Sequence, residues 1–195
     1  MKGTSLAGTS LTRERVEDDF YATDPKSLEL LLDKLKEDNI ELDKYIWEPA
    51  CGKGHLSEVL KNKGYSVYST DLVDRGYGIG DIDFLAINYH NFTGDIITNP
   101  PYKYAQEFVE HSLYTMQDGH YCIMFLKIQF LEGKARKEMF KIYPPKYVYV
   151  FSERQNPMRN GSPVDEKGKK WSSTMCFAWF IWEKGFTGEP IIRWI

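Results

Sequence analysis

The clearest hydrophobic pattern in the chain begins about twenty residues from its start. Four leucines recur at the i, i+3, i+4, i+7 spacing of a one-sided helix, with charged residues between them. They are Leu28, Leu31, Leu32 and Leu35. Asp24 followed by Pro25 is typical of an N-cap and a first helical position. The pattern predicts an amphipathic helix that begins at residue 25.

Beyond this helix, short apolar runs alternate with amphipathic stretches. The predicted strands are 45–47, 65–70, 95–98, 121–126, 147–151 and 175–182, and the predicted helices are 55–63, 105–116 and 134–142. Such alternation builds βαβ units, so we expect an α/β fold with a mostly parallel sheet and helices on both faces. The last two strands have no helix between them and are expected to form an antiparallel hairpin at one edge of the sheet.

Length and composition indicate one domain. The chain has 195 residues, of which 42% are hydrophobic and 15% aromatic, enough for one buried core. Residues 1–18 are small, polar or charged and show no sustained period, which predicts a flexible N-terminal arm. We therefore expect a single domain over 19–195, with 152–172 as a polar loop excursion.

Charge and cysteine content exclude several classes of protein. The net charge is −3, so any contact with nucleic acid is expected to use a local basic patch rather than an overall positive field. The longest apolar run has eight residues, far below the ~20 that cross a bilayer. Neither the three cysteines nor the four histidines have a metal-ligand spacing. These features predict a cytoplasmic protein with no membrane span and no metal.

The first segment with candidate chemistry is Glu-Pro-Ala-Cys-Gly-Lys-Gly, residues 48–54, between a predicted strand and a helix. Glycines let a ligand approach the backbone there, and the helix presents its N–H groups. Asp71, at the end of the next predicted strand, is placed to accept hydrogen bonds from ribose hydroxyls. The turn lacks a third glycine and a Gly-Lys-Ser/Thr ending, so a nucleoside without phosphates fits better. An ordinary turn and an acid that caps a loop are the alternatives.

The second segment is Asn99-Pro100-Pro101-Tyr102, directly after a predicted buried strand. Pro101 has no N–H, which leaves the Pro100 carbonyl able to point at a substrate. The Asn99 side-chain oxygen is a second acceptor, and Tyr102 offers an aromatic face. Two acceptors and a ring suit a planar group that carries an NH₂. A proline-rich turn with an Asx cap is the alternative.

The third segment is the polar excursion, whose residues 152–171 carry a local charge of +2 from five Lys or Arg and three Asp or Glu. Trp171 in this segment and Phe177 in the strand after it could stack on bases. The candidate nucleic-acid contacts are Arg154, Arg159, Lys169, Lys170, Trp171 and Phe177. A solvated loop fits the same charge balance equally well.

Five pieces of sequence occur together in a recognisable order. They are Phe-Tyr-Ala-Thr-Asp-Pro (20–25), Glu-Pro-Ala-Cys-Gly-Lys-Gly-His-Leu (48–56), Asp71, Asp-Phe-Leu (83–85) and Asp-Ile-Ile-Thr-Asn-Pro-Pro-Tyr (95–102). In this order they resemble the S-adenosylmethionine-dependent amino-methyltransferases, and more narrowly the small phage- and prophage-type DNA adenine-N6 methyltransferases. The resemblance covers most of 19–195, and Asn-Pro-Pro-Tyr is its most specific part.

This resemblance implies a Rossmann-like class I methyltransferase fold with a seven-stranded sheet, S-adenosylmethionine as cofactor, and DNA with a flipped adenine as partner. It implies that Asn99, Pro100, Pro101 and Tyr102 are the catalytic residues. The implied cofactor-binding residues are Tyr21, Thr23, Pro25, Glu48, Ala50, Cys51, Gly52, Gly54, Asp71, Leu72, Asp83 and Phe84. Among these, Asp71 would take the ribose hydroxyls, Asp83 the cofactor's adenine amino group, and Phe84 the adenine ring.

Two other functions fit the same residues. Asn-Pro-Pro-Tyr also occurs in methyltransferases that act on RNA adenine or on a protein glutamine amide. The glutamine enzymes usually carry an additional N-terminal helical domain, for which residues 1–18 are too short. A non-catalytic methyltransferase-like binding subunit is the third possibility, although the intact motifs argue against it. The sequence indicates neither an oligomeric state nor a target DNA sequence.

Overall fold

The computed structural model describes residues 21–155, 158–159, 168 and 175–195, with backbone alone at 21–22 and 158–159. The predicted arm at 1–18 lies outside these residues. Within the described part of the chain, no helix is both long and apolar enough to cross a membrane.

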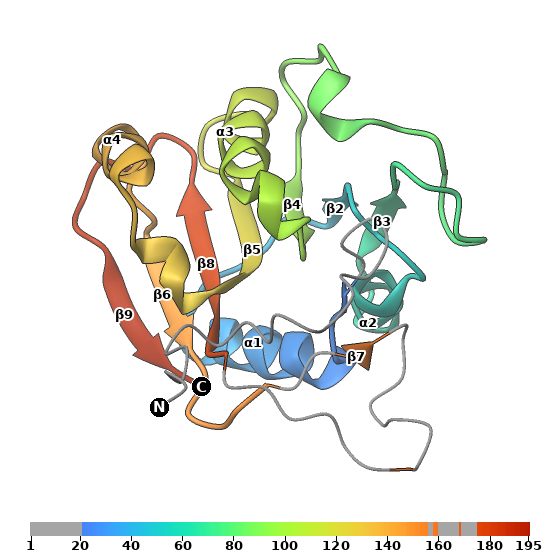
Figure 1. Ribbon diagram of the computed structural model, residues 1–195, viewed down its shortest axis with the longest axis horizontal. Coiled ribbons are helices and arrows are strands. Elements are labelled where there is room, and N and C mark those ends of the chain that lie inside the picture. The colour runs from blue at the N-terminus through green and yellow to red at the C-terminus, as the bar shows by residue number, and fades with distance from the viewer. Residues whose placement is uncertain (1–20, 156–157, 160–167, 169–174) are drawn as a thin grey trace, which may run out of the picture.

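A seven-stranded sheet forms the centre of the molecule (Figure 1), in the order β3-β2-β4-β5-β8-β6-β9. The strands are β2 (Tyr45–Glu48), β3 (Ser66–Ser69), β4 (Asp95–Thr98), β5 (Tyr121–Lys127), β6 (Tyr147–Val150), β8 (Phe177–Glu183) and β9 (Ile191–Trp194). β3, β2, β4 and β5 are parallel, β8 is antiparallel to both β5 and β6, and β9 is parallel to β6. The predicted α/β fold, with a mostly parallel sheet and an antiparallel β6–β8 pair, is confirmed.

Helices cover both faces of this sheet, as the alternating pattern predicts. They are α1 (Pro25–Glu37), α2 (His55–Asn62), α3 (Ala105–Thr115) and α4 (Lys134–Ile142), with 3₁₀ helices η2 (Phe84–Ala86), η3 (Tyr102–Tyr104) and η4 (Ile128–Leu131). In Figure 1, α3 and α4 lie in the upper part of the view and α1 and α2 in the lower part.

One face of the sheet packs against α3 and α4. Ile96, Met124 and Phe180 come from three different strands and are fully buried there. Val109 of α3 and Met139 of α4 close the same cluster. Burial of such side chains contributes roughly 1.5–3 kcal/mol each, so this layer is a main source of stability.

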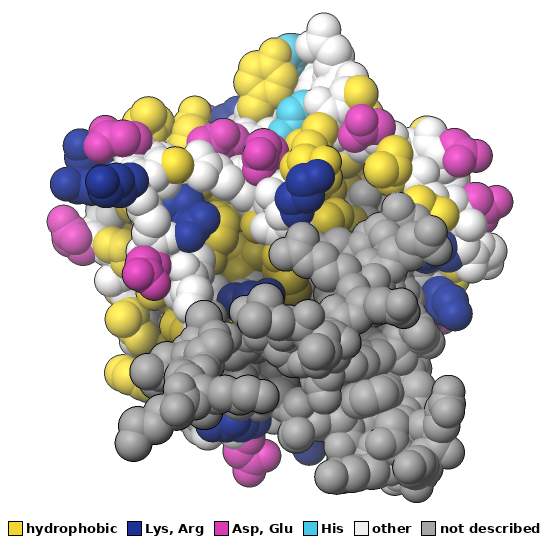
Figure 2. Space-filling model, in the orientation of Figure 1, with side chains coloured by type: hydrophobic (Ala, Val, Ile, Leu, Met, Phe, Trp, Pro, Cys, Tyr) yellow, Lys and Arg dark blue, Asp and Glu magenta, His cyan; other side chains and the backbone are white. Residues whose placement is uncertain are grey.

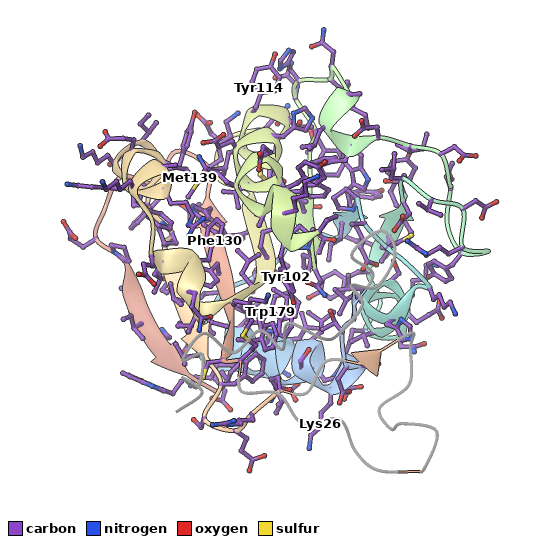
Figure 3. All side chains as sticks on the ribbon, in the orientation of Figure 1. Lys26, Tyr102, Tyr114, Phe130, Met139 and Trp179 are labelled. Atoms are coloured by element: carbon purple, nitrogen blue, oxygen red, sulfur yellow. The ribbon has the colours of Figure 1, made fainter. Side chains whose placement is uncertain are left out.

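The other face packs against α1 and α2. Ile97, Ile123 and Trp179 are buried there together with Leu31 of α1 and Leu60 of α2. Because side chains alternate along a strand, Ile96 and Ile97 serve opposite clusters. Figure 3 shows Trp179 beside α1, while Phe130 and Met139 lie toward η4 and α4.

Helix α1 begins where the sequence predicts. The Asp24 carboxylate accepts the Lys26 N–H (3.0 Å), and Pro25 is the first helical residue. The predicted leucine stripe is buried. The Trp179 indole N–H donates to the Ser27 carbonyl (3.0 Å), which ties the start of the helix to β8.

Two features differ from the sequence expectation. The β6–β8 pair is not at the edge of the sheet, because β9 adds in parallel outside β6. Most residues of β9 are exposed, so no apolar alternation marks it. A second, two-stranded sheet pairs β1 (Tyr21–Ala22) with β7 (Met158–Arg159), so the predicted excursion at 152–172 contains a strand.

Candidate functional site

The candidate residues follow three adjacent strands at the point where each strand ends. β2 pairs with β3 on one side and with β4 on the other, all parallel. Their carboxyl ends therefore share one edge of the sheet, where Glu48, Asp71 and Asn99 are found. The chain goes from β2 to β3 on one side and then returns to β4 on the other. Open α/β sheets bind ligands at such a reversal of strand order.

The turn after β2 depends on two glycines in left-handed conformation. Gly52 has φ 55° and Gly54 has φ 81°, values that favour glycine. The Gly54 N–H donates to the Cys51 carbonyl (2.8 Å), and the Cys51 N–H donates to the Thr70 carbonyl (2.9 Å). A Cβ at Gly54 would lie 2.4 Å from the Tyr77 ring. The turn is thus both strained for other residues and closely covered.

The covering residue, Tyr77, was not predicted as part of the site. Its hydroxyl donates to the Glu58 carboxylate (2.6 Å) and accepts from the Lys61 ammonium (2.7 Å). Both partners are on α2, so the loop after β3 is fastened to the helix that the turn begins. Residues 74–91 have no hydrophobic periodicity, and no sequence signal indicated this contact.

Asp71 links the turn to the end of β3. Its carboxylate accepts the Gly52 N–H (2.7 Å) and the Val73 N–H (3.0 Å), with the Arg75 Nε atom 4.0 Å away. A carboxylate has about four acceptor positions, so these backbone bonds do not exhaust it. Asp71 is only 9% exposed, which places an anionic acceptor in a sheltered position at the turn.

Glu48 is the most deeply buried acid of the site, at 2% exposure. The Ser57 hydroxyl donates to it, and the Ser57 and Ser69 hydroxyl oxygens are 2.6 Å apart. Burial raises the pKa of Glu48 to about 8, against the smaller opposing effect of the Ser57 hydrogen bond. Glu48 is therefore largely neutral at pH 7, and a cation brought beside it would favour its ionised form.

The predicted residues for the cofactor's adenine divide into two groups. Leu72 is 61% exposed, and the exposed Asp83 accepts the Leu85 N–H (3.0 Å) as the N-cap of η2. Phe84 is 2% exposed, and its ring lies 5.1 Å from that of Trp47 in an edge-to-face arrangement. The structure therefore gives Phe84 a packing role in the core, whereas Leu72 and Asp83 are open to solvent.

The N-terminal candidates lie around the start of α1. Thr23 is buried and immediately precedes the N-cap, and Pro25 is the first residue of the helix. The backbone of Tyr21 pairs with that of Arg159. The two-stranded sheet thus joins the segment predicted to hold cofactor to the segment predicted to hold nucleic acid. Ala50 is partly buried in the turn.

The Asn99–Tyr102 loop leaves β4 and turns into η3. The Pro101 carbonyl accepts the Tyr104 N–H (2.8 Å), which begins the 3₁₀ helix. Asn99 is half-buried, and its Oδ1 atom is shielded from solvent. Pro100 is buried. The loop is therefore held by its own backbone and by the packing of the strand that it follows.

Tyr102 lies in a group of aromatic rings at this edge. Its ring centroid is 6.1 Å from that of Phe177, and Phe177 in turn stacks on Phe125 at 5.1 Å. The Lys127 ammonium lies over the Tyr102 ring, 4.5 Å from its centroid. Figure 3 labels Tyr102 between Phe130 and Trp179. Of the sequence candidates, the structure brings Phe177 to Tyr102, although Phe177 itself is 4% exposed.

The other nucleic-acid candidates are placed less fully. Arg154 is exposed in the segment after β6, and only the backbone of Arg159 is described, in β7. Lys169, Lys170 and Trp171 lie outside the described residues. Figure 2 shows Lys and Arg side chains around a hollow with a hydrophobic floor, next to the region drawn in grey.

The described residues contain the three cysteines of the chain and other possible metal ligands. No group of three or more His, Cys, Asp or Glu there could hold a metal ion. Cys51 and Cys122 are buried, and Cys176 is exposed. Burial raises the pKa of Cys51 to about 12, so its thiol is not ionised at neutral pH. The Cys51 Sγ atom lies 3.7 Å from the Tyr77 carbonyl oxygen, so the thiol contacts the loop that covers the turn.

Comparison with solved structures identifies the fold. A candidate class I S-adenosylmethionine-dependent methyltransferase from Listeria monocytogenes is 15% identical, with a TM-score of 0.59 over 88% of this chain. A candidate RNA methyltransferase from Pyrococcus horikoshii is 14% identical, with a TM-score of 0.61 over 92% of this chain and 94% of its own. The modification subunit of a candidate type I restriction enzyme from Vibrio vulnificus YJ016 is 12% identical, with a TM-score of 0.53 over 90% of this chain and 47% of its own.

These similarities define a class of fold. The chain has the Rossmann-like fold of class I S-adenosylmethionine-dependent methyltransferases, as the sequence predicts. It spans 64% of the length of the Listeria protein. No protein-family model matches the chain, and no curated protein matches it.

Proposed function

We propose that this protein transfers a methyl group from S-adenosylmethionine to the N6 amino group of adenine in DNA. One observation carries the proposal. The Asn99–Tyr102 loop and the glycine turn with Asp71 leave adjacent parallel strands at the same edge of the sheet. A methyl donor and a planar amine held by these two parts would meet there.

The turn and its two acids suit the cofactor. Gly52 and Gly54 let a ligand approach the backbone, and Asp71 has acceptor positions left for ribose hydroxyls. Glu48 is sheltered and can become charged beside the ammonium group of a methionine moiety. When bound, S-adenosylmethionine supplies an electrophilic methyl group on a sulfonium centre.

The Asn99–Tyr102 loop provides hydrogen-bond acceptors that can make an adenine amine more nucleophilic. The lone pair of adenine N6 is delocalised into the ring, so the amine is a poor nucleophile. Hydrogen bonds from N6–H to the Asn99 side-chain oxygen and the Pro100 carbonyl favour a more tetrahedral nitrogen with a localised lone pair. The nitrogen gains positive charge during the reaction, so the same two acceptors bind the transition state more strongly than the ground state.

Tyr102 would stack on the target base. An adenine inside a duplex must be flipped out of the helix, which costs a few kcal/mol, and stacking on an aromatic ring recovers part of this. No general base is needed before transfer, because the nitrogen gives up its proton, to solvent water, only after it becomes cationic. Asn99, the Pro100 carbonyl and Tyr102 are thus sufficient for the acceptor side of the reaction.

DNA is the favoured acceptor, and RNA is the second candidate. The basic residues of the polar excursion and the likeness to the restriction-modification subunit support DNA. The likeness to the candidate RNA methyltransferase, which covers nearly the whole of both chains, supports RNA. The two acceptors share adenine N6 and differ in the backbone that carries the base.

The proposal is tested by incubation with methyl-labelled S-adenosylmethionine and separate pools of DNA, RNA and protein. We expect label in DNA, and its loss by about 10²- to 10³-fold in Asn99→Ala, because one of two transition-state acceptors is removed. Label only in RNA would mean that the methyl acceptor is RNA and not DNA. Label only in protein would indicate a glutamine amide, and cofactor binding without transfer to any pool would indicate a non-catalytic subunit.

A further inference from the structure

Lys127 and Tyr102 meet at the site from two neighbouring strands. Lys127 is the last residue of β5, and Tyr102 is the fourth residue after the end of β4. β4 and β5 are parallel, with Thr98 opposite Met124, so both residues leave the sheet at the same edge. The Lys127 Nζ atom lies 4.5 Å from the centroid of the Tyr102 ring.

The backbone of Lys127 is fixed. Its Cα is paired with that of Phe177 on β8, and the next N–H, of Ile128, donates to the Cys176 carbonyl (2.9 Å). The side chain, in contrast, is a flexible four-carbon stem with a point charge at its end. Any response of this residue to a ligand therefore takes place in the side chain alone.

The ammonium covers one face of the Tyr102 ring, and the proposed function needs a face of this ring for a base. A cation is attracted to the face of an aromatic ring by the ring's quadrupole. The same face cannot hold an ammonium and a stacked adenine together. A cation beside N6 would also oppose the positive charge that develops there. For a base to stack on this face, the Lys127 ammonium has to move to another partner.

A nucleotide acceptor carries an anionic group with which the Lys127 ammonium can pair, whereas a glutamine side chain does not. Each nucleotide carries an anionic phosphate joined to its sugar, and Lys binds phosphate as a point charge. A second lysine, Lys103, directly follows Tyr102 and is exposed, with its ammonium 4.7 Å from the Tyr104 ring centroid. The loop thus carries local positive charge in a chain whose net charge is −3.

We infer that Lys127 is a substrate-binding residue that leaves the Tyr102 ring and pairs with a backbone phosphate of the nucleic-acid acceptor when the target base stacks there. This inference rests on the proposed function. It makes Lys127 a residue that distinguishes a nucleotide acceptor from a protein amide.

The test compares Lys127→Met, which keeps the length of the stem without the charge, with Lys127→Arg, which keeps the charge. Lys44→Met is the matched control, because Lys44 is exposed just before β2, at the opposite edge of the sheet. Binding of a labelled adenine-containing oligodeoxynucleotide is measured by fluorescence anisotropy over a series of salt concentrations. Binding of S-adenosylhomocysteine is measured by calorimetry on the same samples.

We expect Lys127→Met to bind the oligonucleotide several-fold more weakly at low salt. Its log–log salt slope should fall in magnitude by about 0.7–0.9, the value for one phosphate contact. Lys127→Arg should keep most of the slope, and Lys44→Met all of it. S-adenosylhomocysteine binding should be unchanged in all three variants, which shows that the fold and the cofactor site are intact.

A second comparison separates the phosphate from the base. Lys127→Met should bind adenosine at least as tightly as the wild type, because the ring face is vacated, and deoxyadenosine monophosphate more weakly. An unchanged salt slope together with unchanged oligonucleotide affinity would overturn the role of Lys127 and leave the proposed function standing. A wild-type protein that binds no oligonucleotide but methylates protein would overturn both.

Discussion

At the residue scale, the side of the site proposed for the cofactor contains two acids that are held in different ways. Asp71 is fixed by two backbone N–H donors. Glu48 instead accepts a hydrogen bond from the Ser57 hydroxyl, which in turn lies 2.6 Å from the Ser69 hydroxyl oxygen. Burial raises the pKa of Glu48 to about 8. The Ser57 hydrogen bonds and the Lys61 charge oppose this rise, and the Asp71 charge adds to it. Asp71 can serve as a charged acceptor while Glu48 starts out neutral.

This arrangement predicts a pH dependence of stability. Glu48 has a higher pKa in the folded protein, about 8, than the ordinary 4.5 of an unfolded chain, so the folded state binds more protons between these values. Its contribution is complete below about pH 4.5 and is lost as the pH rises to about 8. The total is at most a few kcal/mol, since one pKa unit corresponds to about 1.4 kcal/mol.

The measurement is urea unfolding of wild type and Glu48→Gln at pH values from 6 to 9. Burial also raises the pKa of Asp95, to about 6, so the effect of Glu48 is taken from the difference between the two proteins and not from the wild-type slope alone. We expect the free energy of unfolding of the wild type to fall across this interval and that of Glu48→Gln to fall less. Glu41→Gln, at an exposed loop position, is the control. Equal slopes for wild type and Glu48→Gln would contradict the account.

At the scale of elements, the glycine turn and α2 form one unit with the loop after β3. Gly54 caps α2 and lies directly under the Tyr77 ring, which is hydrogen-bonded to the same helix. The turn is therefore shaped by the loop that covers it as well as by its own conformation. The chain offers a matched comparison, because Gly64 also has a left-handed φ (94°) but no atom within 4 Å of a Cβ placed there.

We expect Gly64→Ala to cost about 1–2 kcal/mol, the strain of a left-handed alanine alone. Gly54→Ala should cost clearly more and weaken cofactor binding, because its Cβ also collides with the Tyr77 ring. In the double variant with Gly54→Ala, Tyr77→Ala should remove most of the additional loss of stability. A double-mutant cycle measures this coupling. Equal losses for the two glycine variants, or no coupling to Tyr77, would show that the contact does not shape the turn.

The elements predicted best are those whose sequence pattern and packing agree. The leucines of α1 and the Asp24 cap gave its first residue correctly, because the same stripe is buried against β8 and α2. The strand β9 could not be predicted, since Ile191 and Ile192 are largely exposed and its pairing with β6 is made by the backbone. Hydrophobic periodicity arises where one face of an element is buried, so an exposed edge strand shows little periodicity.

The same reasoning explains which parts of the candidate site the sequence could indicate. Asn99–Tyr102 became a candidate because a distinctive tetrapeptide follows a predicted buried strand. The contact of Lys127 with Tyr102 could not be predicted, because it depends on the register of β5 beside β4. Phe84 packs edge-to-face on Trp47, and its contact with a cofactor ring stays a prediction. Motifs give the position of a residue in the chain but not the direction of its side chain.

At the scale of the whole molecule, the sheet places the residues proposed for the cofactor next to those proposed for the acceptor, on different strands. The ends of β2 and β3 carry the residues proposed for the cofactor, and the end of β4 carries those proposed for the acceptor. The two halves of the site belong to different βα units, which a rigid sheet holds in register. Substitution in one half should therefore leave binding in the other half intact.

Thermal unfolding with S-adenosylhomocysteine tests this separation. At 100 times its Kd, a ligand stabilises the folded state by about 2.7 kcal/mol, which raises the Tm of a chain of this size by roughly 5–10 °C. We expect this rise in the wild type and in Asn99→Ala, and its loss in Asp71→Ala. A rise that survives in Asp71→Ala, or that disappears in Asn99→Ala, would mean that the assignment of the two halves is wrong.

The most direct test of the central claim is nucleoside analysis of DNA after incubation with S-adenosylmethionine and either wild-type protein or Asn99→Ala. The account predicts N6-methyladenine as the methylated product with the wild type, and at least a hundredfold less with Asn99→Ala. Methylation at a different base or atom, or N6-methyladenine formed equally well by Asn99→Ala, would contradict it.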